Sequence, residues 1–135
     1  MDQDAIAEIT RGGLIETLGI DLRELTAERV VATMPVTPRH VQIFGHLHGG
    51  ASVALAETVA SIGCFLSCPP GYGGFGLEIN ANHLRPKRDG VLTATGVPLH
   101  RGRTTHVWDV KIADEAGKLV CVSRCTVAIV ALDWR

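Results

Sequence analysis

Aromatic residues are scarce in this chain, and neither positive nor negative charge is in marked excess. Only 4% of its 135 residues are Phe, Trp or Tyr, although 46% are hydrophobic. The core must therefore be built mainly from Ala, Val, Leu and Ile, which suits a sheet packed closely on a helix of small residues. The net charge of −1 gives no reason to expect nucleic acid or an anionic membrane surface as the main partner.

The chain also lacks the pattern of a leader or a membrane anchor. Residues 1–5 (MDQDA) are acidic and carry neither the basic nor the apolar region of a signal peptide, which predicts a cytoplasmic protein. The longest apolar run, residues 49–66, is interrupted by Ser52, Glu57, Thr58 and Ser61. It is therefore a poor transmembrane segment, and we expect it to be buried in protein.

Four cysteines form two C-x-x-x-C pairs, Cys64 with Cys68 and Cys121 with Cys125. If the second pair lies on a strand, four residues at about 3.3 Å each place the thiols roughly 13 Å apart, too far for one tetrahedral ion. We expect core thiols in a reducing compartment. His46 and His48 lack a third ligand with suitable spacing, so no metal is expected.

Periodicity indicates the secondary structure. Apolar residues at helical spacing predict one short amphipathic helix over residues 4–18, weakened by Gly12 and Gly13. Alternation predicts a strand over Arg29–Val36, and the apolar run from Gly49 predicts a long helix. A breaker over 68–74 follows. Four more strands are then expected, at Phe75–Leu84, Val91–Leu99, Thr104–Ala113 and Leu119–Leu132.

The connections at 86–90, 100–103 and 114–118 are short and rich in turn residues, which favours antiparallel hairpins. The expected order is α-β-α-β-β-β-β in a single domain, residues 1–135. Because a largely apolar helix needs burial, we expect an α+β fold in which a curved antiparallel sheet wraps around it. Uncovered sheet edges then favour self-association.

Glu57 is the single charged residue of the predicted long helix. A carboxylate among apolar residues is costly unless something compensates it. It could form a structural ion pair or network with an Arg or His from elsewhere, or it could be a reactive group made so by desolvation. Gly49 and Gly50, at the start of the helix, leave backbone N–H groups unshielded where the helix dipole favours negative charge. Unshielded N–H donors near the positive end of a dipole are what an oxyanion hole requires.

The segment around this acid, His48-Gly49-Gly50-Ala51-Ser52 followed by Leu55-Ala56-Glu57, resembles the hotdog-fold acyl-CoA thioesterases in which a glutamate on the central helix does the chemistry. That branch includes 4-hydroxybenzoyl-CoA, phenylacetate-pathway and 1,4-dihydroxy-2-naphthoyl-CoA thioesterases and the enterobactin-proofreading thioesterase. The likeness runs from Gln42 through 76–83, 98–100 and 107–108 to the last strand.

The resemblance implies a role for each matching residue. Glu57 would be the nucleophile or the general base, and the Gly49 N–H would stabilise the oxyanion. Gln42 and His48 would line the reaction centre, with His48 orienting the thioester or the glycine turn. Ser61 shares the face of Glu57 and would place water or contact the acyl group, unless its hydroxyl bonds back to the Glu57 carbonyl. Thr58 points about 100° away and is the weaker hydroxyl.

The remaining candidates are substrate-binding residues. His83 matches a position near the acyl pocket, although a structural histidine fits as well, and His46 is expected on the surface. Two basic clusters could bind the phosphates of coenzyme A or could simply be solvated turns. They are Arg85, Lys87 and Arg88, and Arg101 with Arg103.

The predicted activity is hydrolysis of acyl-CoA, or acyl-carrier-protein, thioesters with aromatic or medium-sized acyl groups. Coenzyme A is then part of the substrate and no cofactor is needed. The family implies a homodimer or homotetramer with active sites at the interface. Two alternatives are a hotdog enoyl-CoA hydratase or dehydratase and a non-catalytic acyl-CoA sensor. The first departs from the pattern because His48 is followed directly by Gly49, and the second would not need an acid at Glu57.

Overall fold

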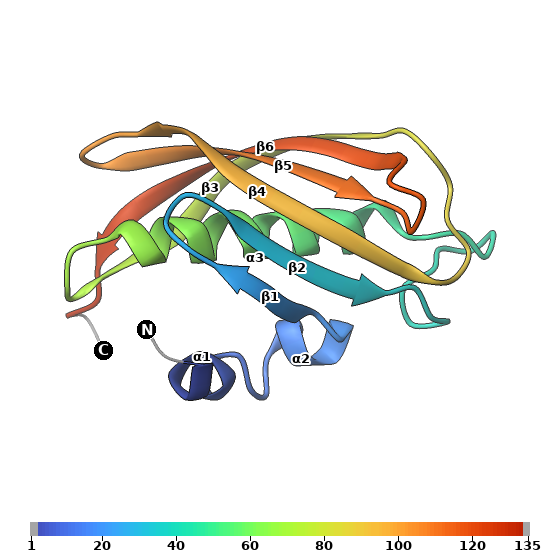
Figure 1. Cartoon of the computed structure of the whole chain (residues 1–135), viewed down its shortest axis with the longest axis horizontal. Helices are drawn as coiled ribbons and strands as arrows, with labels where there is room; N and C mark the ends of the chain where they lie inside the picture. Colours follow the sequence, from blue (N-terminus) through green and yellow to red (C-terminus); the bar gives the residue numbers. More distant parts are fainter. Residues whose placement is uncertain (1–2, 134–135) are drawn as a thin grey trace.

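A six-stranded antiparallel sheet curves over one long helix in the computed structural model, which describes residues 3–133 (Figure 1). The helix is α3 (Gly49–Ser67), and two short helices, α1 (Gln3–Ile9) and α2 (Leu14–Leu18), precede the sheet. The strands are β1 (Asp21–Leu25), β2 (Val30–Pro35), β3 (Tyr72–His83), β4 (Val91–Arg101), β5 (Thr105–Ala113) and β6 (Leu119–Ala131). The α+β class and the sheet around a central helix are confirmed.

Small residues on α3 let the sheet approach it closely. Ala56, Ala60 and Gly63 are buried against strands β2 to β6. A Cβ on Gly63 would lie 2.3 Å from the indole of Trp108, so this glycine makes the room for the largest core side chain. By length and composition α3 could also cross a membrane. Its packing against five strands instead identifies it as the central helix of the core.

The N-terminal region differs from the prediction in two ways. The expected helix over 4–18 is divided into α1 and α2, because Gly12 adopts a φ of +79° that a continuing helix cannot accommodate. The strand β1 was not predicted. Its sequence, DLREL, is dominated by charge, and its pairing with β2 shifts register between Leu22 and Glu24, so the alternation that marks a strand is weak.

The strand order corrects the predicted succession of hairpins. In the sheet the order is β1-β2-β4-β5-β6-β3, so β4, β5 and β6 are neighbours as expected, whereas β3 pairs with β6. Since β2 occupies the other side of β4, residues 84–90 form a crossover instead of a hairpin. This crossover is held where the Leu47 N–H donates to the Lys87 carbonyl over 2.6 Å. The consequence is that β3 becomes an edge strand.

Candidate active site

The start of α3 presents one unpaired backbone donor. His48 is the N-cap residue in extended conformation, and its Nδ1 accepts a hydrogen bond from the Gly50 N–H over 2.8 Å. Within residues 3–133 the Gly49 N–H has no acceptor. The His48 ring therefore holds the glycine turn, one of the two orienting roles predicted for it. This leaves the Gly49 N–H as the donor without a partner.

A cavity of about 370 Å³ lies beside Gly49. It is lined by Gln42, His46, Leu47, Gly49, Ser52, His83, Leu84, Arg85, Pro86 and Val120. The His83 ring lies against Gly49 so closely that a Cβ on this glycine would be 2.9 Å from Nε2. The structure therefore brings together four of the predicted site residues, from the loop before α3, the helix start and the end of β3.

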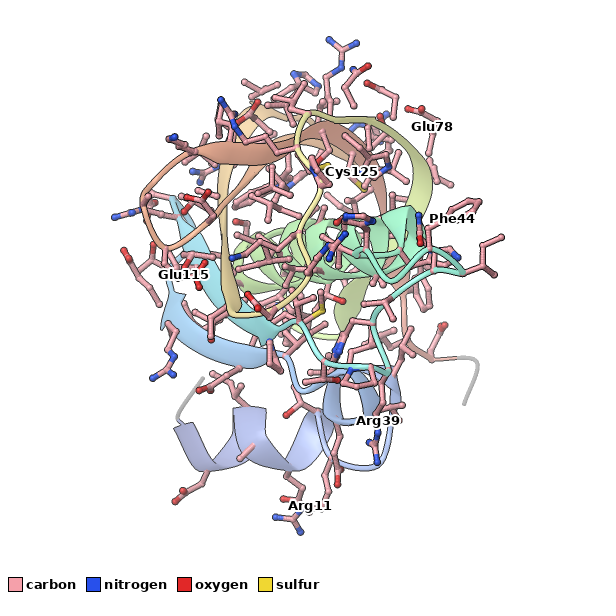
Figure 2. The ribbon with its side chains drawn as sticks, turned by 90° about the vertical axis from the view of Figure 1, so that its right-hand side faces the viewer. Arg11, Arg39, Phe44, Glu78, Glu115 and Cys125 are labelled. Carbon is pink, nitrogen blue, oxygen red and sulfur yellow. The ribbon has the colours of Figure 1, made fainter. Side chains whose placement is uncertain are left out.

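Gln42 holds the loop that enters the helix. Its Oε1 accepts hydrogen bonds from the Phe44 N–H over 2.5 Å and the His46 N–H over 3.3 Å. Because the amide oxygen is used in this turn, the NH₂ group is the part of Gln42 that remains for a ligand. At the tip of the turn Ile43 and Phe44 are 93% and 75% exposed, and Figure 2 shows Phe44 on the same side of the molecule as Glu78 of β3.

His46, which was expected on the surface, also forms part of the cavity wall. The residue is half-buried and lines the cavity, and its Nε2 lies 3.1 Å from the donating Nε of Arg88. The loop before the helix turns back on itself, with the Gln42 N–H donating to the His46 carbonyl over 2.7 Å. Its glycine, Gly45, supplies the positive φ of +79° that this turn needs.

Glu57 is half-buried in the middle of α3 and forms neither a hydrogen bond nor an ion pair through its carboxylate with any residue from 3 to 133. No structural partner that could have explained it is found among residues 3–133. The carboxylate lies against Gly76 of β3, where a Cβ would be 2.5 Å from Oε1. A shift of register between Gly76 and Glu78 marks the same place on the strand. Glu57 therefore reaches the uncovered edge of the sheet.

Hydroxyl groups along α3 fall into two kinds. Thr58 Oγ1 donates to the Ala54 carbonyl over 2.7 Å, and Ser67 Oγ donates to the Gly63 carbonyl over 3.2 Å. Ser61 makes no such bond in the described part of the chain, so the back-bonding alternative for this residue is not observed. Its half-buried hydroxyl remains available one turn beyond Glu57.

The cysteines are core thiols, as predicted. Cys64, Cys121 and Cys125 are buried, and all four cysteines are free. Burial, and then the negative charges of Glu57 and Glu78, raise the pKa of the Cys125 thiol to about 12. Figure 2 shows Cys125 between the sheet and α3. Such thiols are protonated and unreactive at neutral pH. No group of three or more His, Cys, Asp or Glu side chains in the described residues could hold a metal.

The first basic cluster lies beside the cavity. Arg85 lines it and donates from Nη1 to the Leu119 carbonyl over 2.7 Å. Lys87 pairs with Glu115 over 2.6 Å, and Arg88 contacts His46. One member of this cluster, Arg85, therefore lines the cavity, and Arg88 contacts a second lining residue, His46.

The second basic cluster, Arg101 and Arg103, lies at the other end of the sheet (Figure 1). Arg101 on β4 pairs with His106 on β5, which in turn pairs with Val127 on β6. His83 on β3 pairs instead with Cys121 on β6. Six residues on β6 separate these two positions by about 20 Å. Within one chain, the two clusters cannot both reach one short ligand at Gly49.

Ser52 was not predicted as a site residue. It is fully buried yet lines the cavity, and among the described residues its Oγ is the single buried side-chain nitrogen or oxygen atom without a hydrogen-bond partner. Its spacing from Gly49 was the available signal, since residues three apart share a helix face.

Known proteins resemble the chain over nearly its whole length. The sequence profile of the thioesterase superfamily matches residues 44–121. A 1,4-dihydroxy-2-naphthoyl-CoA hydrolase from Listeria monocytogenes is 50% identical over 117 residues, 87% of this chain and 95% of the relative. The proofreading thioesterase EntH from Cronobacter turicensis is 41% identical over 129 residues, 96% and 94% of the two chains. The crystal structure of a thioesterase from Haemophilus influenzae superposes with a TM-score of 0.92 at 41% identity, covering 98% and 93%.

Proposed function

The chain belongs to the thioesterase superfamily and is a thioester hydrolase, and we propose that it hydrolyses acyl-CoA thioesters with aromatic or medium-sized acyl groups. The observation that supports this most directly is the pairing of an unpartnered carboxylate, Glu57, with an unpartnered N–H, Gly49, on one helix. The proposed location is cytoplasmic, and the chemistry needs no cofactor beyond the coenzyme A of the substrate.

The two groups suit the two requirements of the reaction. The Gly49 N–H, at the positive end of the helix dipole, stabilises the negative charge that develops on the carbonyl oxygen. Glu57 either attacks the carbonyl carbon or takes a proton from the attacking water. If Glu57 attacks, a C–O bond to Glu57 forms as the C–S bond breaks, and water then hydrolyses the resulting mixed anhydride and frees Glu57. If water attacks, its oxygen forms the C–O bond directly as the C–S bond breaks. Either route releases the carboxylic acid and coenzyme A, whose sulfur takes up a proton supplied by the water. Ser61, on the face of Glu57, is placed to hold the water or a polar group of the acyl moiety.

One chain does not supply both groups to one substrate. Glu57 is eight residues after Gly49, which is about 12 Å along the helix axis. It is also not among the residues that line the cavity at Gly49. A thioester bound at Gly49 therefore takes its carboxylate from a second subunit, as an interface active site requires.

The edge strand β3 is where that second subunit binds. The other edge, β1, has five residues and carries Asp21, Arg23 and Glu24, features that discourage edge pairing. In contrast β3 has twelve residues, and its Phe75 and Leu77 are 42% and 63% exposed. A long, largely uncharged edge pairs readily with a copy of itself about a two-fold axis.

A particular register of this pairing completes the site. If two β3 strands run antiparallel about a two-fold axis at Asn80, the extra residue of the irregularity between Gly76 and Glu78 places Gly76 of one opposite His83 of the other. Glu57, which lies on Gly76, then meets the cavity that His83 and Gly49 line in the second copy. The proposed assembly is this dimer, alone or as half of a tetramer.

The substrate class follows from the cavity and the relatives. Arg85 lines the cavity and Arg88 contacts the lining residue His46, so these two and the neighbouring Lys87 are proposed to bind the phosphates of coenzyme A. One relative is named as a 1,4-dihydroxy-2-naphthoyl-CoA hydrolase and another as a proofreading thioesterase. The aromatic acyl group proposed here is based on the first of these names. An acyl-carrier-protein thioester shares the pantetheine arm and the thioester, so it belongs in the same test.

The test is turnover of benzoyl-, 4-hydroxybenzoyl-, phenylacetyl-, 1,4-dihydroxy-2-naphthoyl- and hexanoyl-CoA, with release of free thiol as the readout. Glu57→Ala should lose at least about 10³-fold in kcat for every substrate that the wild type hydrolyses. Glu8→Gln, at an exposed acid of α1, is the control and should behave as wild type. Full hydrolysis by Glu57→Ala would overturn the assigned chemistry. Hydration of crotonyl-CoA without thiol release would indicate a hydratase, and tight binding without hydrolysis would indicate a sensor.

A further inference from the structure

The hydroxyl of Ser52 is an unusual group in this core. Ser52 is 0% exposed, and its Oγ has no hydrogen-bond partner within residues 3–133. Leaving a buried hydroxyl unpaired destabilises a fold, because the group has lost its water without gaining a replacement. The usual escape for a helical serine is unattractive here, since the carbonyl of His48 already accepts from the Ala51 N–H at 3.0 Å and the Ser52 N–H at 3.4 Å.

The position of Ser52 relative to Gly49 gives this hydroxyl a use. The two residues are three apart, about 4.5 Å along the axis, and a helical side chain leans back toward the N-terminal turn. Both line the same cavity. An oxygen atom bound at this end of the cavity would therefore lie near both the Gly49 N–H and the Ser52 side chain.

The first turn otherwise supplies a single donor. An oxyanion hole normally offers two or more, often from consecutive backbone N–H groups. Here the N–H next to Gly49, that of Gly50, already donates to His48 Nδ1 over 2.8 Å. Gln42 and His83 also line the cavity, but both side chains are partly exposed and can hydrogen-bond water in the absence of substrate. Among residues 3–133, the Ser52 hydroxyl is the single buried side-chain polar group left unpaired.

We propose that the Ser52 hydroxyl is the second donor of the oxyanion hole, acting beside the Gly49 N–H on the thioester carbonyl oxygen. This inference rests on the proposed thioester hydrolysis and adds a residue to it. Ser52 is then a catalytic residue that contacts the reacting oxygen, and its hydroxyl gains a full hydrogen bond when the substrate binds. The fold tolerates an unpaired group in the free enzyme so that the donor is already in place for the substrate.

Removal of the hydroxyl separates a catalytic from a structural role. Ser52→Ala should lower kcat roughly 10²-fold while KM changes little, which is the cost of one oxyanion donor. Because the variant also removes an unsatisfied buried group, its urea midpoint should equal or exceed that of the wild type. Ser67→Ala is the matched control, a serine of the same helix whose hydroxyl donates to Gly63, and it should keep wild-type kcat.

A spectroscopic measurement tests the same contact without turnover. In a Glu57→Gln background, benzoyl-CoA labelled with ¹³C at the carbonyl should show a carbonyl stretch at lower frequency when bound than when free. Adding Ser52→Ala should reverse part of this shift, because one of the two donors that polarise the carbonyl is lost. Ser67→Ala in the same background should leave the bound frequency unchanged.

The outcomes distinguish this inference from the proposed function. Three results would each overturn the role of Ser52 and leave the proposed thioesterase activity intact. They are wild-type kcat for Ser52→Ala, a bound carbonyl frequency that Ser52→Ala does not change, and a loss of kcat that is accompanied by a lower urea midpoint. Absence of thioester hydrolysis and of benzoyl-CoA binding by the wild type would overturn both. A lower kcat with unchanged stability and a partly reversed frequency supports Ser52 as a donor.

Discussion

The first turn of α3 offers hydrogen-bond donors, and the middle of the same helix offers an acceptor. At the first turn Gly49, whose N–H is unpaired, and Ser52, whose hydroxyl is buried and unpaired, line a cavity next to the end of β3. In the middle, the Glu57 carboxylate lies against Gly76, seven residues earlier on that strand. The difference shows that a single chain holds the proposed donors and the proposed acceptor in separate places. In the proposed dimer, a two-fold axis on the β3 edge brings them together.

The separation of donors and acceptor is tested most strongly by mixing two inactive variants, one altered at Glu57 and one at Gly49. Glu57→Gln should be inactive for lack of the acceptor, and Gly49→Val should be inactive because a Cβ there collides with the His83 ring. If the donors and the acceptor come from two subunits, an equal mixture refolded together from urea should recover about a quarter of wild-type activity, since half the dimers are mixed and each mixed dimer has one intact site.

Each variant refolded alone is the control for this mixture, with its oligomeric state followed by light scattering. Recovery of activity only after the subunits exchange supports the shared site. A dimeric mixture that stays inactive would place the donors and the acceptor of one site within one chain and remove the distinction between the two regions.

The contact between Glu57 and Gly76 is the next point to disturb. Gly76→Ala places a Cβ 2.5 Å from Oε1, and the flexible end of the glutamate can move away without unfolding the chain. We expect kcat to fall roughly 10²-fold, as for a displacement of about 1 Å at a reacting group. Gly13→Ala is the control, because nothing lies within 4 Å of its Cβ and its φ is −112°. Equal kcat for the two variants would show that the carboxylate does not need this position.

Substitutions in the two basic clusters test which of them binds the phosphates of the substrate. The double variant Arg85→Gln/Arg88→Gln should raise KM for benzoyl-CoA roughly tenfold, equivalent to about 1.4 kcal/mol, and the effect should shrink at high salt. The matched variant Arg101→Gln/Arg103→Gln, about 20 Å away along the sheet, should leave KM unchanged. The N-acetylcysteamine thioester of benzoate lacks the phosphates and should respond to neither. A response to the second pair alone would assign the phosphates to the hairpin of a neighbouring subunit.

The smallest predicted effect concerns stability at the hairpin end of the sheet. Burial first, and then the charges of Arg101 and His100, hold the pKa of His106 below its usual range. In the folded state its Nδ1 accepts from the Trp108 indole N–H over 3.3 Å, so the ring is neutral. The unfolded chain therefore binds more protons, and the free energy of unfolding should decrease as the pH falls below about 6.5.

Urea unfolding of the wild type and of His106→Gln at pH 7.5 and 5.5 measures this dependence. The variant should lose less stability between the two pH values than the wild type. Identical pH dependence in the two proteins would assign the change to other titrating groups.

The sequence predicted the elements that bury the most apolar surface. The alternation at β2, β4, β5 and β6 and the small residues of α3 depend on side-chain pattern alone. The same pattern failed at β1, where charge hides the alternation. It predicted β3 as a strand but not its place next to β6, which depends on which strands remain unpaired. Glu57 and Gly49 were identified because a lone acid and adjacent glycines are anomalous in an apolar helix.

Local chemistry thus determined the central helix, its open N-terminus and the anomalous carboxylate, because propensity, spacing and charge act over a few residues. Tertiary structure alone decided which groups are satisfied and which are not. It showed that the Gly50 N–H is taken by His48, that Thr58 and Ser67 bond backward, and that Ser52 does not. It also placed Glu57 on the free edge of the sheet, because burial and strand order are set by contacts between distant segments.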